Sequence, residues 1–104
     1  MKMPGSMQAL MKQANQLQSK MKKTQEELAK REYDGTSGGG AVKITINGEY
    51  KMMAIKISPD AAGDVDMLQD LILTATNDAV RICKETTAKE MEKVTGGLNI
   101  PGMF

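Results

Sequence analysis

The chain has 104 residues and a net charge of +1 at neutral pH, so we expect one domain with a small core. It has no histidine and one cysteine, Cys83, which excludes an internal disulfide, Ser-His and Cys-His nucleophile pairs and His-ligated metal sites. No apolar run is long enough to cross a membrane and the start lacks a signal-peptide pattern, so a cytoplasmic protein is expected.

The first predicted element is a long helix over about residues 7–31. Pro and Gly are absent from Met7 to Lys30, and Ser6 is a suitable N-cap. At about 1.5 Å per residue the helix would be roughly 36 Å long, so part of it should project beyond a small sheet. Spacings of three and four residues form a heptad seam at Met7, Leu10, Ala14, Leu17, Met21, Thr24 and Leu28.

This helix is also basic, because residues 1–31 carry seven basic side chains and only two acidic ones. At 100° per residue, Lys12, Lys23 and Lys30 fall within about 20° of one another, opposite the seam. A lysine-rich helix face is usually only a solvated surface. Here the charge excess and the projection beyond the sheet favour contacts to phosphates, which give affinity without reading sequence.

Residues 32–58 are predicted to form a sheet. Two alternating apolar runs, 42–46 and 53–57, predict two strands with their aliphatic side chains on one face. The Asn47-Gly48 pair between them predicts a two-residue type I′ turn. Such a turn would place Val42 opposite Met53.

The segment 32–37 is predicted to be a third strand at the edge of the sheet. The glycines at 38–40 would form the turn that joins it to the next strand. A phosphate-binding loop is the alternative for these glycines. It is disfavoured because they lead into a strand and Lys43 is not followed by Ser or Thr.

A second long helix is predicted over about residues 65–95, with Asp64 as its N-cap and an apolar tail at 96–104. Cys83 lies beside its seam and is expected to be a small buried apolar residue. The two helices are expected to pair antiparallel, with the start of the first near Lys89 and Lys93. The seam of the second helix comprises Val65, Leu68, Ile72, Ala75, Ala79, Ile82 and Thr86.

Four blocks of the sequence, LMKQANQLQSKMKKTQEEL, GGGAVKITINGEYKMMAIKISP, MLQDLILTATNDAVR and TGGLNIPGMF, resemble the YbaB/EbfC family of bacterial nucleoid-associated DNA-binding proteins. The resemblance implies an α+β fold in a single domain over residues 1–104, with a three-stranded antiparallel sheet between two long helices. It also implies a tweezer-like homodimer without enzymatic activity. The joint Ser58–Asp64 departs from the family pattern at Ser58 and at Ala61-Ala62.

The function implied is binding of duplex DNA through basic helical arms, with effects on nucleoid organisation and gene expression. We expect no catalytic residue, metal, cofactor, small-molecule substrate or membrane partner. The alternative is a protein-interaction module that recruits a partner protein through the heptad seam and the Met-rich surface. The candidate DNA-binding residues are Lys12, Lys20, Lys22, Lys23, Lys30 and Arg31 on the first helix, with Arg81, Lys84 and Lys89 on the second.

Overall fold

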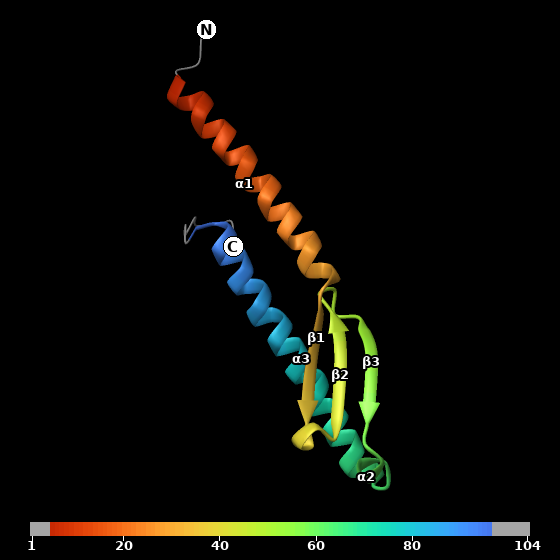
Figure 1. The fold of residues 1–104 in the computed structure, drawn as a ribbon. Coiled ribbons are helices and arrows are strands. Elements are labelled where there is room, and N and C mark those ends of the chain that lie inside the picture. The colour runs from red at the N-terminus through yellow and green to blue at the C-terminus, as the bar shows by residue number, and fades with distance from the viewer. Residues whose placement is uncertain (1–4, 97–104) are drawn as a thin grey trace.

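A computed structural model describes residues 5–96, in which a three-stranded sheet follows one long helix along the chain and packs against the other (Figure 1). The predicted α+β order of helix, three antiparallel strands and helix is confirmed. Most of the predicted apolar tail, residues 97–104, lies outside the described residues. The elements are α1 (Gly5–Lys30), β1 (Glu32–Ser37), the 3-10 turn η1 (Gly38–Gly40), β2 (Val42–Asn47), β3 (Met52–Ile57), α2 (Pro59–Ala62) and α3 (Val65–Val94).

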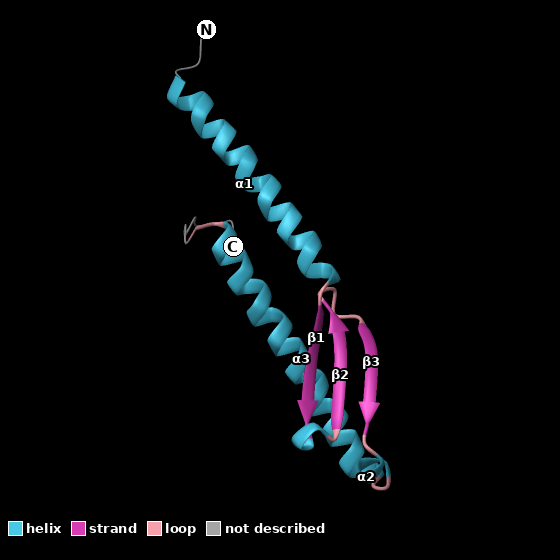
Figure 2. Cartoon of the chain, in the orientation of Figure 1, coloured by secondary structure: helices cyan, strands magenta, loops and turns pink. Residues whose placement is uncertain are grey.

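The core lies between α3 and one face of the sheet, whose strand order is β1-β2-β3 (Figure 2). Ala75, Ala79 and Cys83 of α3 are fully buried there, so the predicted burial of Cys83 is confirmed. These small side chains let the helix approach the sheet closely. The buried residues of the covered sheet face are Tyr33, Gly35 and Ser37 of β1 with Val42, Ile44 and Ile46 of β2.

The predicted two-residue turn between β2 and β3 is wrong. β2 ends at Asn47 and β3 begins at Met52, so four residues, 48–51, separate the strands, and the Asn47 N–H donates to the Lys51 carbonyl at 2.9 Å. Tyr50, and not Gly48, takes the positive φ, at 64°. The Asn47 side-chain oxygen also accepts the N–H groups of Glu49 and Lys51, which holds the loop in this form.

The register of the hairpin differs from the prediction for the same reason. Ile57, and not Met53, lies opposite Val42, and Ile55 lies opposite Ile44. The pairing shifts by one residue between Thr45 and Ile46, because Thr45 lies opposite Ala54 and Ile46 lies opposite Met52. Such a shift is typical of a β-bulge. The aliphatic side chains of both strands still share one face, because the partners of a β pair point to the same side.

Gly48 is required for close approach rather than for a positive φ. Its N–H donates to the Ala29 carbonyl at 3.1 Å, near the end of α1. A β-carbon at Gly48 would lie 2.7 Å from the Ala29 Cα. The hairpin loop therefore packs against the last turn of α1, a contact between segments that local turn preferences do not describe.

The predicted N-cap is confirmed for α3 but not for α1. Asp64 caps α3 as predicted, and its side chain accepts the Met67 N–H at 3.1 Å. The prediction for Ser6 is wrong, because α1 begins at Gly5 and contains Ser6. The short helix α2 was not predicted; it has Pro59 in its first turn, where a missing N–H costs nothing.

The two long helices run antiparallel, but α3 ends beside the second half of α1 (Figure 1). The seam of α1 is at least partly buried at Leu17, Met21, Thr24 and Leu28, whereas Met7 and Leu10 are exposed. The prediction that the start of α1 lies near Lys89 and Lys93 is therefore wrong. In residues 5–96, no helix combines the length and the apolar character needed to span a bilayer.

Candidate nucleic-acid interface

The first two thirds of α1 carry positive charge without any acidic side chain. Lysines are the only charged residues between Gly5 and Gln25, and they stand at positions 12, 20, 22 and 23. All four side chains are exposed. No ion pair within residues 5–96 engages them. Their ammonium groups are therefore available to an anionic partner. We call these four residues the α1 lysine stretch.

The predicted shared face follows from the regularity of α1, which is one unbroken helix over 26 residues. Lys12, Lys23 and Lys30 lie on this face, and the first and last are separated by roughly 27 Å along the axis. That length corresponds to about eight phosphates along one strand of B-DNA. The face is thus long enough to follow a DNA backbone.

Lys30 and Arg31 stand at the end of α1, where they also have structural partners. Lys30 lies in the last turn, where a cation interacts favourably with the helix dipole. The Arg31 Nη1 lies 4.0 Å from Glu90 Oε1 of α3. Arg31 therefore links the two helices as well as adding to the basic surface.

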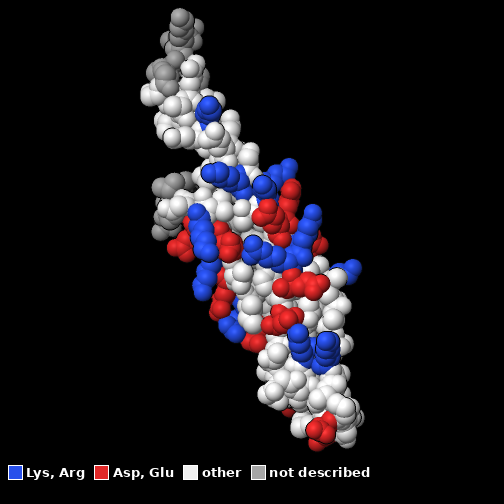
Figure 3. Space-filling view, in the orientation of Figure 1, with Lys and Arg blue, Asp and Glu red and all other residues white. Residues whose placement is uncertain are grey.

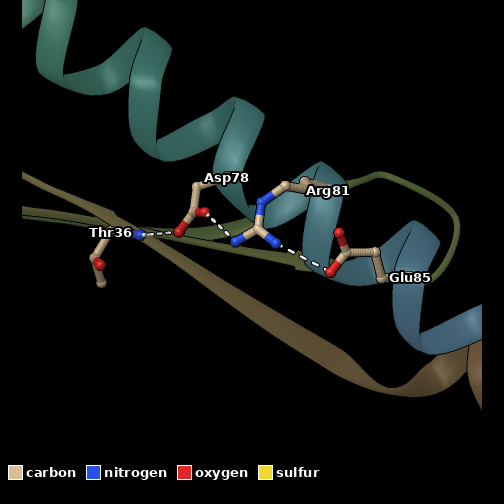
Figure 4. A network of polar contacts seen from close by, with 4 residues as sticks. All are labelled: Thr36, Asp78, Arg81 and Glu85. Carbon is tan, nitrogen blue, oxygen red and sulfur yellow. Dashed lines mark hydrogen bonds and ion pairs between the residues drawn. The ribbon is translucent and has the colours of Figure 1, made fainter.

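Arg81 is held by two carboxylates of its own helix (Figure 4). Its Nη2 lies 2.8 Å from Asp78 Oδ1, and its Nη1 lies 3.0 Å from Glu85 Oε2. The other oxygen of Asp78 accepts the Thr36 N–H at 3.2 Å. The guanidinium and this N–H lower the pKa of Asp78, and the carboxylates raise the pKa of Arg81. The group is net negative, so Arg81 is less available to a phosphate than its exposure suggests.

Lys84 and Lys89 are exposed on α3 and have no ion pair in the described part of the chain. They stand among acidic neighbours, since Glu85, Glu90 and Glu92 occupy the same region of the helix. Figure 3 shows blue and red side chains mixed over the middle of the molecule, and no red over the upper part of α1. Within the α1 lysine stretch, Lys12 and Lys20 have no acidic residue within four positions, whereas Glu26 and Glu27 follow Lys22 and Lys23 by one helical turn.

Two further lysines lie on the open face of the sheet and were not among the predicted residues. Lys43 stands opposite Lys56 in the β2–β3 pair. Lys43 Nζ lies 3.3 Å from Asp34 Oδ2, and the Thr45 hydroxyl donates to Asp34 Oδ1 at 2.6 Å. The Thr45 hydrogen bond, followed by Lys43, lowers the pKa of Asp34. The alternation of Lys43 with buried neighbours was the sequence signal that could have placed it on this face.

An exposed apolar surface runs along β3. Met52, Met53, Ile55 and Ile57 are between 38% and 50% exposed, and they form what we call the β3 surface. At the opposite edge of the sheet, the outward-facing Thr36 N–H of β1 already has a partner, because it donates a hydrogen bond to the Asp78 carboxylate of α3. The free, apolar edge of this sheet is therefore β3, the kind of edge that attracts a protein partner.

Acidic side chains do not gather into a metal site. Within residues 5–96 no group of three His, Cys, Asp or Glu residues has a suitable arrangement for an ion. The free thiol of Cys83 is fully buried.

Comparison with known proteins agrees with these features. The model of the YbaB/EbfC DNA-binding family matches residues 3–98. A nucleoid-associated protein of Clostridium kluyveri is 48% identical over 102 residues, which cover 96% of this chain and 90% of the relative. Another, from Desulforamulus reducens, is 51% identical over 104 residues and covers 98% and 99%.

A solved structure has the same fold. It belongs to an uncharacterized protein from Helicobacter pylori, and it aligns with a TM-score of 0.70. The alignment covers 91% of this chain and 100% of the other, at 20% identity. At that identity the similarity concerns the fold alone.

Proposed function

This chain belongs to the YbaB/EbfC DNA-binding family, and we propose that it binds duplex DNA as a nucleoid-associated architectural protein. The family is defined by DNA binding and not by a catalysed reaction. Effects on nucleoid organisation and gene expression would follow from that binding. The protein would then act in the cytoplasm, at the nucleoid.

The α1 lysine stretch is the observation that carries this proposal. Four exposed lysines, of which Lys12 and Lys20 have no acidic residue within four positions, form a positive rod beyond the core. Side chains of this kind contact phosphates, so affinity should fall steeply with added salt and depend little on base sequence. Lys30 and Arg31 would extend the contact at the sheet end, and Lys84 and Lys89 would add to it from α3. Arg81 would contribute least, because two carboxylates hold it.

We also propose that the protein acts as a homodimer. The supporting observation is the β3 surface, which leaves about half of each Met52 and Met53 side chain exposed. A second copy that covered this surface would bury apolar area that one copy leaves in water, at about 25 cal/mol per Å². Two copies would present two basic arms to one DNA molecule, which raises the effective concentration of the second contact.

A protein-interaction module is the second candidate, and the same β3 surface favours it. In that case the surface would bind a different protein, and the lysines would serve solubility. The two candidates differ in what they predict for DNA. An interaction module should show no duplex binding at moderate salt and should co-purify with another protein.

A duplex-DNA titration at two salt concentrations, on random and defined sequences, tests the proposal. The slope of log affinity against log salt is negative, and each lost phosphate contact makes it less steep by about 0.9. The double variant Lys12→Gln with Lys23→Gln should therefore have a slope that is less steep by about two for each subunit on the DNA. The matched control, Lys51→Gln with Lys56→Gln, removes the same charge from the sheet and its loop.

Unchanged affinity and slope in the Lys12 and Lys23 variant would show that α1 is not the site. A larger effect of the control pair would place the contact at the sheet instead. No binding by the parent protein at either salt concentration would favour the interaction module.

A further inference from the structure

The start of α1 is an apolar helix segment that no described part of the chain covers. Met7 and Leu10 are 49% and 60% exposed, although they continue the seam that α3 covers farther along, and Met11 next to them is 53% exposed. A helix end of about 12 residues without tertiary contacts is only marginally stable in water. The segment at 5–16 therefore needs a partner for its seam.

The place where α3 ends identifies the partner. Figure 1 shows the end of α3 beside the second half of α1, below the exposed part of the seam. Thr95 is buried at this level, and Gly96 ends the helix with a φ of 63° and its N–H on the Lys93 carbonyl at 3.2 Å. The described part of the chain thus ends at Gly96, below the uncovered seam.

The length and composition of the eight residues that follow Gly96 fit the gap. From Leu17 back to Met7 the seam covers roughly 15 Å of helix. Residues 97–104 can span up to about 26 Å when extended. Four of the eight are large apolar residues, at Leu98, Ile100, Met103 and Phe104. Pro101 favours an extended path, because it cannot continue a helix.

We propose that the C-terminal segment 97–104 docks on the exposed α1 seam of its own chain and braces the outer part of this helix. The segment takes the place along α1 that α3 would occupy if it were longer. It lies on the side opposite Lys12, so it leaves that lysine free. The inference concerns the support of α1 and does not depend on DNA binding.

Hydrogen–deuterium exchange on the full chain tests this. A chain ended after Gly96 should exchange the amides of residues 7–14 about tenfold faster than the full chain. The amides of α3 and the sheet should be unchanged. Leu98→Ser with Ile100→Ser should reproduce the loss of protection, whereas Asn99→Ser is the matched control and should not. Equal exchange at residues 7–14 with and without the segment would overturn the proposal.

A mixing experiment separates docking within one chain from docking on a second copy. Isotope-labelled full chain is mixed with an excess of unlabelled chain that ends after Gly96. Docking within the chain keeps the labelled α1 protected in the mixture. Loss of that protection would show that the segment comes from another copy and would overturn the intramolecular form. Leu10→Gln should in turn speed exchange of the full chain's residues 98–104.

Discussion

Gly35 of β1 lies so close to α3 that a β-carbon at Gly35 would stand 2.8 Å from the Cα of Ala79. The backbone atoms Ala75 O and Ala79 N would be closer still. Because these atoms belong to helix backbone, they cannot rotate away as a side chain would. This contact sets the distance of α3 from the sheet, and so the direction in which its far end meets α1.

Replacing Gly35 should therefore be costly. Gly35→Ala should lower the free energy of unfolding by about 2–4 kcal/mol, since the helix must move off the sheet. Gly63→Ala is the matched control, because a β-carbon there has no heavy atom within 4 Å and its φ of −79° suits alanine. Urea denaturation of both variants measures the difference. Similar midpoints for the two would contradict the close contact.

Asp78 should make stability depend on pH in the acid range. Its pKa is lowered in the folded protein by Arg81 and by the Thr36 N–H, from an ordinary value of 3.8. The unfolded chain therefore takes up the proton first, so the contribution is complete above pH 3.8 and is lost as pH falls through the lowered folded value. Asp78→Asn should flatten the fall in stability below pH 3.8. The control Asp70→Asn, which changes an exposed carboxylate of the same helix, should retain the fall in stability. Thermal unfolding of both variants as a function of pH measures the difference.

Arg81 and Lys23 should differ in their effect on DNA binding although both are exposed cations. Lys23→Gln should reduce the salt slope of duplex affinity by about 0.9 for each subunit on the DNA. Arg81→Gln should change the slope by much less, because the carboxylates of Asp78 and Glu85 already neutralise the guanidinium. Titrations of the two single variants under matched salt provide the comparison. An equal or larger effect of Arg81 would show that it leaves its carboxylates to meet DNA.

The proposed homodimer should depend on the β3 surface. Ile55→Lys places a charge in an apolar interface and should convert a dimer at micromolar concentration into a monomer. Lys56→Gln changes the next residue on the opposite face of the same strand and should leave the dimer intact. Light scattering measures the mass of each. A monomeric parent protein, or a dimeric Ile55→Lys variant, would refute this interface.

Much of the fold was predictable because it depends on local patterns. The seam of α3 from Leu68 onward, the burial of Cys83 and the cap at Asp64 follow from spacings of three and four residues and from a side chain next to a helix start, whereas Val65 of the predicted seam is exposed. The alternation at 42–46 likewise determined which face of β2 is buried. The α1 lysine stretch was visible for the same reason, since its members lie within one regular helix.

Only the tertiary structure showed the contacts between segments that lie far apart in the chain. The Gly48 backbone contacts Ala29 at the end of α1. With this contact the chain forms a four-residue loop and not the two-residue turn that Asn47-Gly48 favours by itself. Asp78 meets Thr36 across 42 positions, which helps to fix the carboxylate that neutralises Arg81. The sequence by itself determined which faces are apolar or basic, because periodicity is a local property. The structure decided where α3 stops along α1, and so which basic and apolar side chains remain uncovered, because that depends on the packing of distant segments.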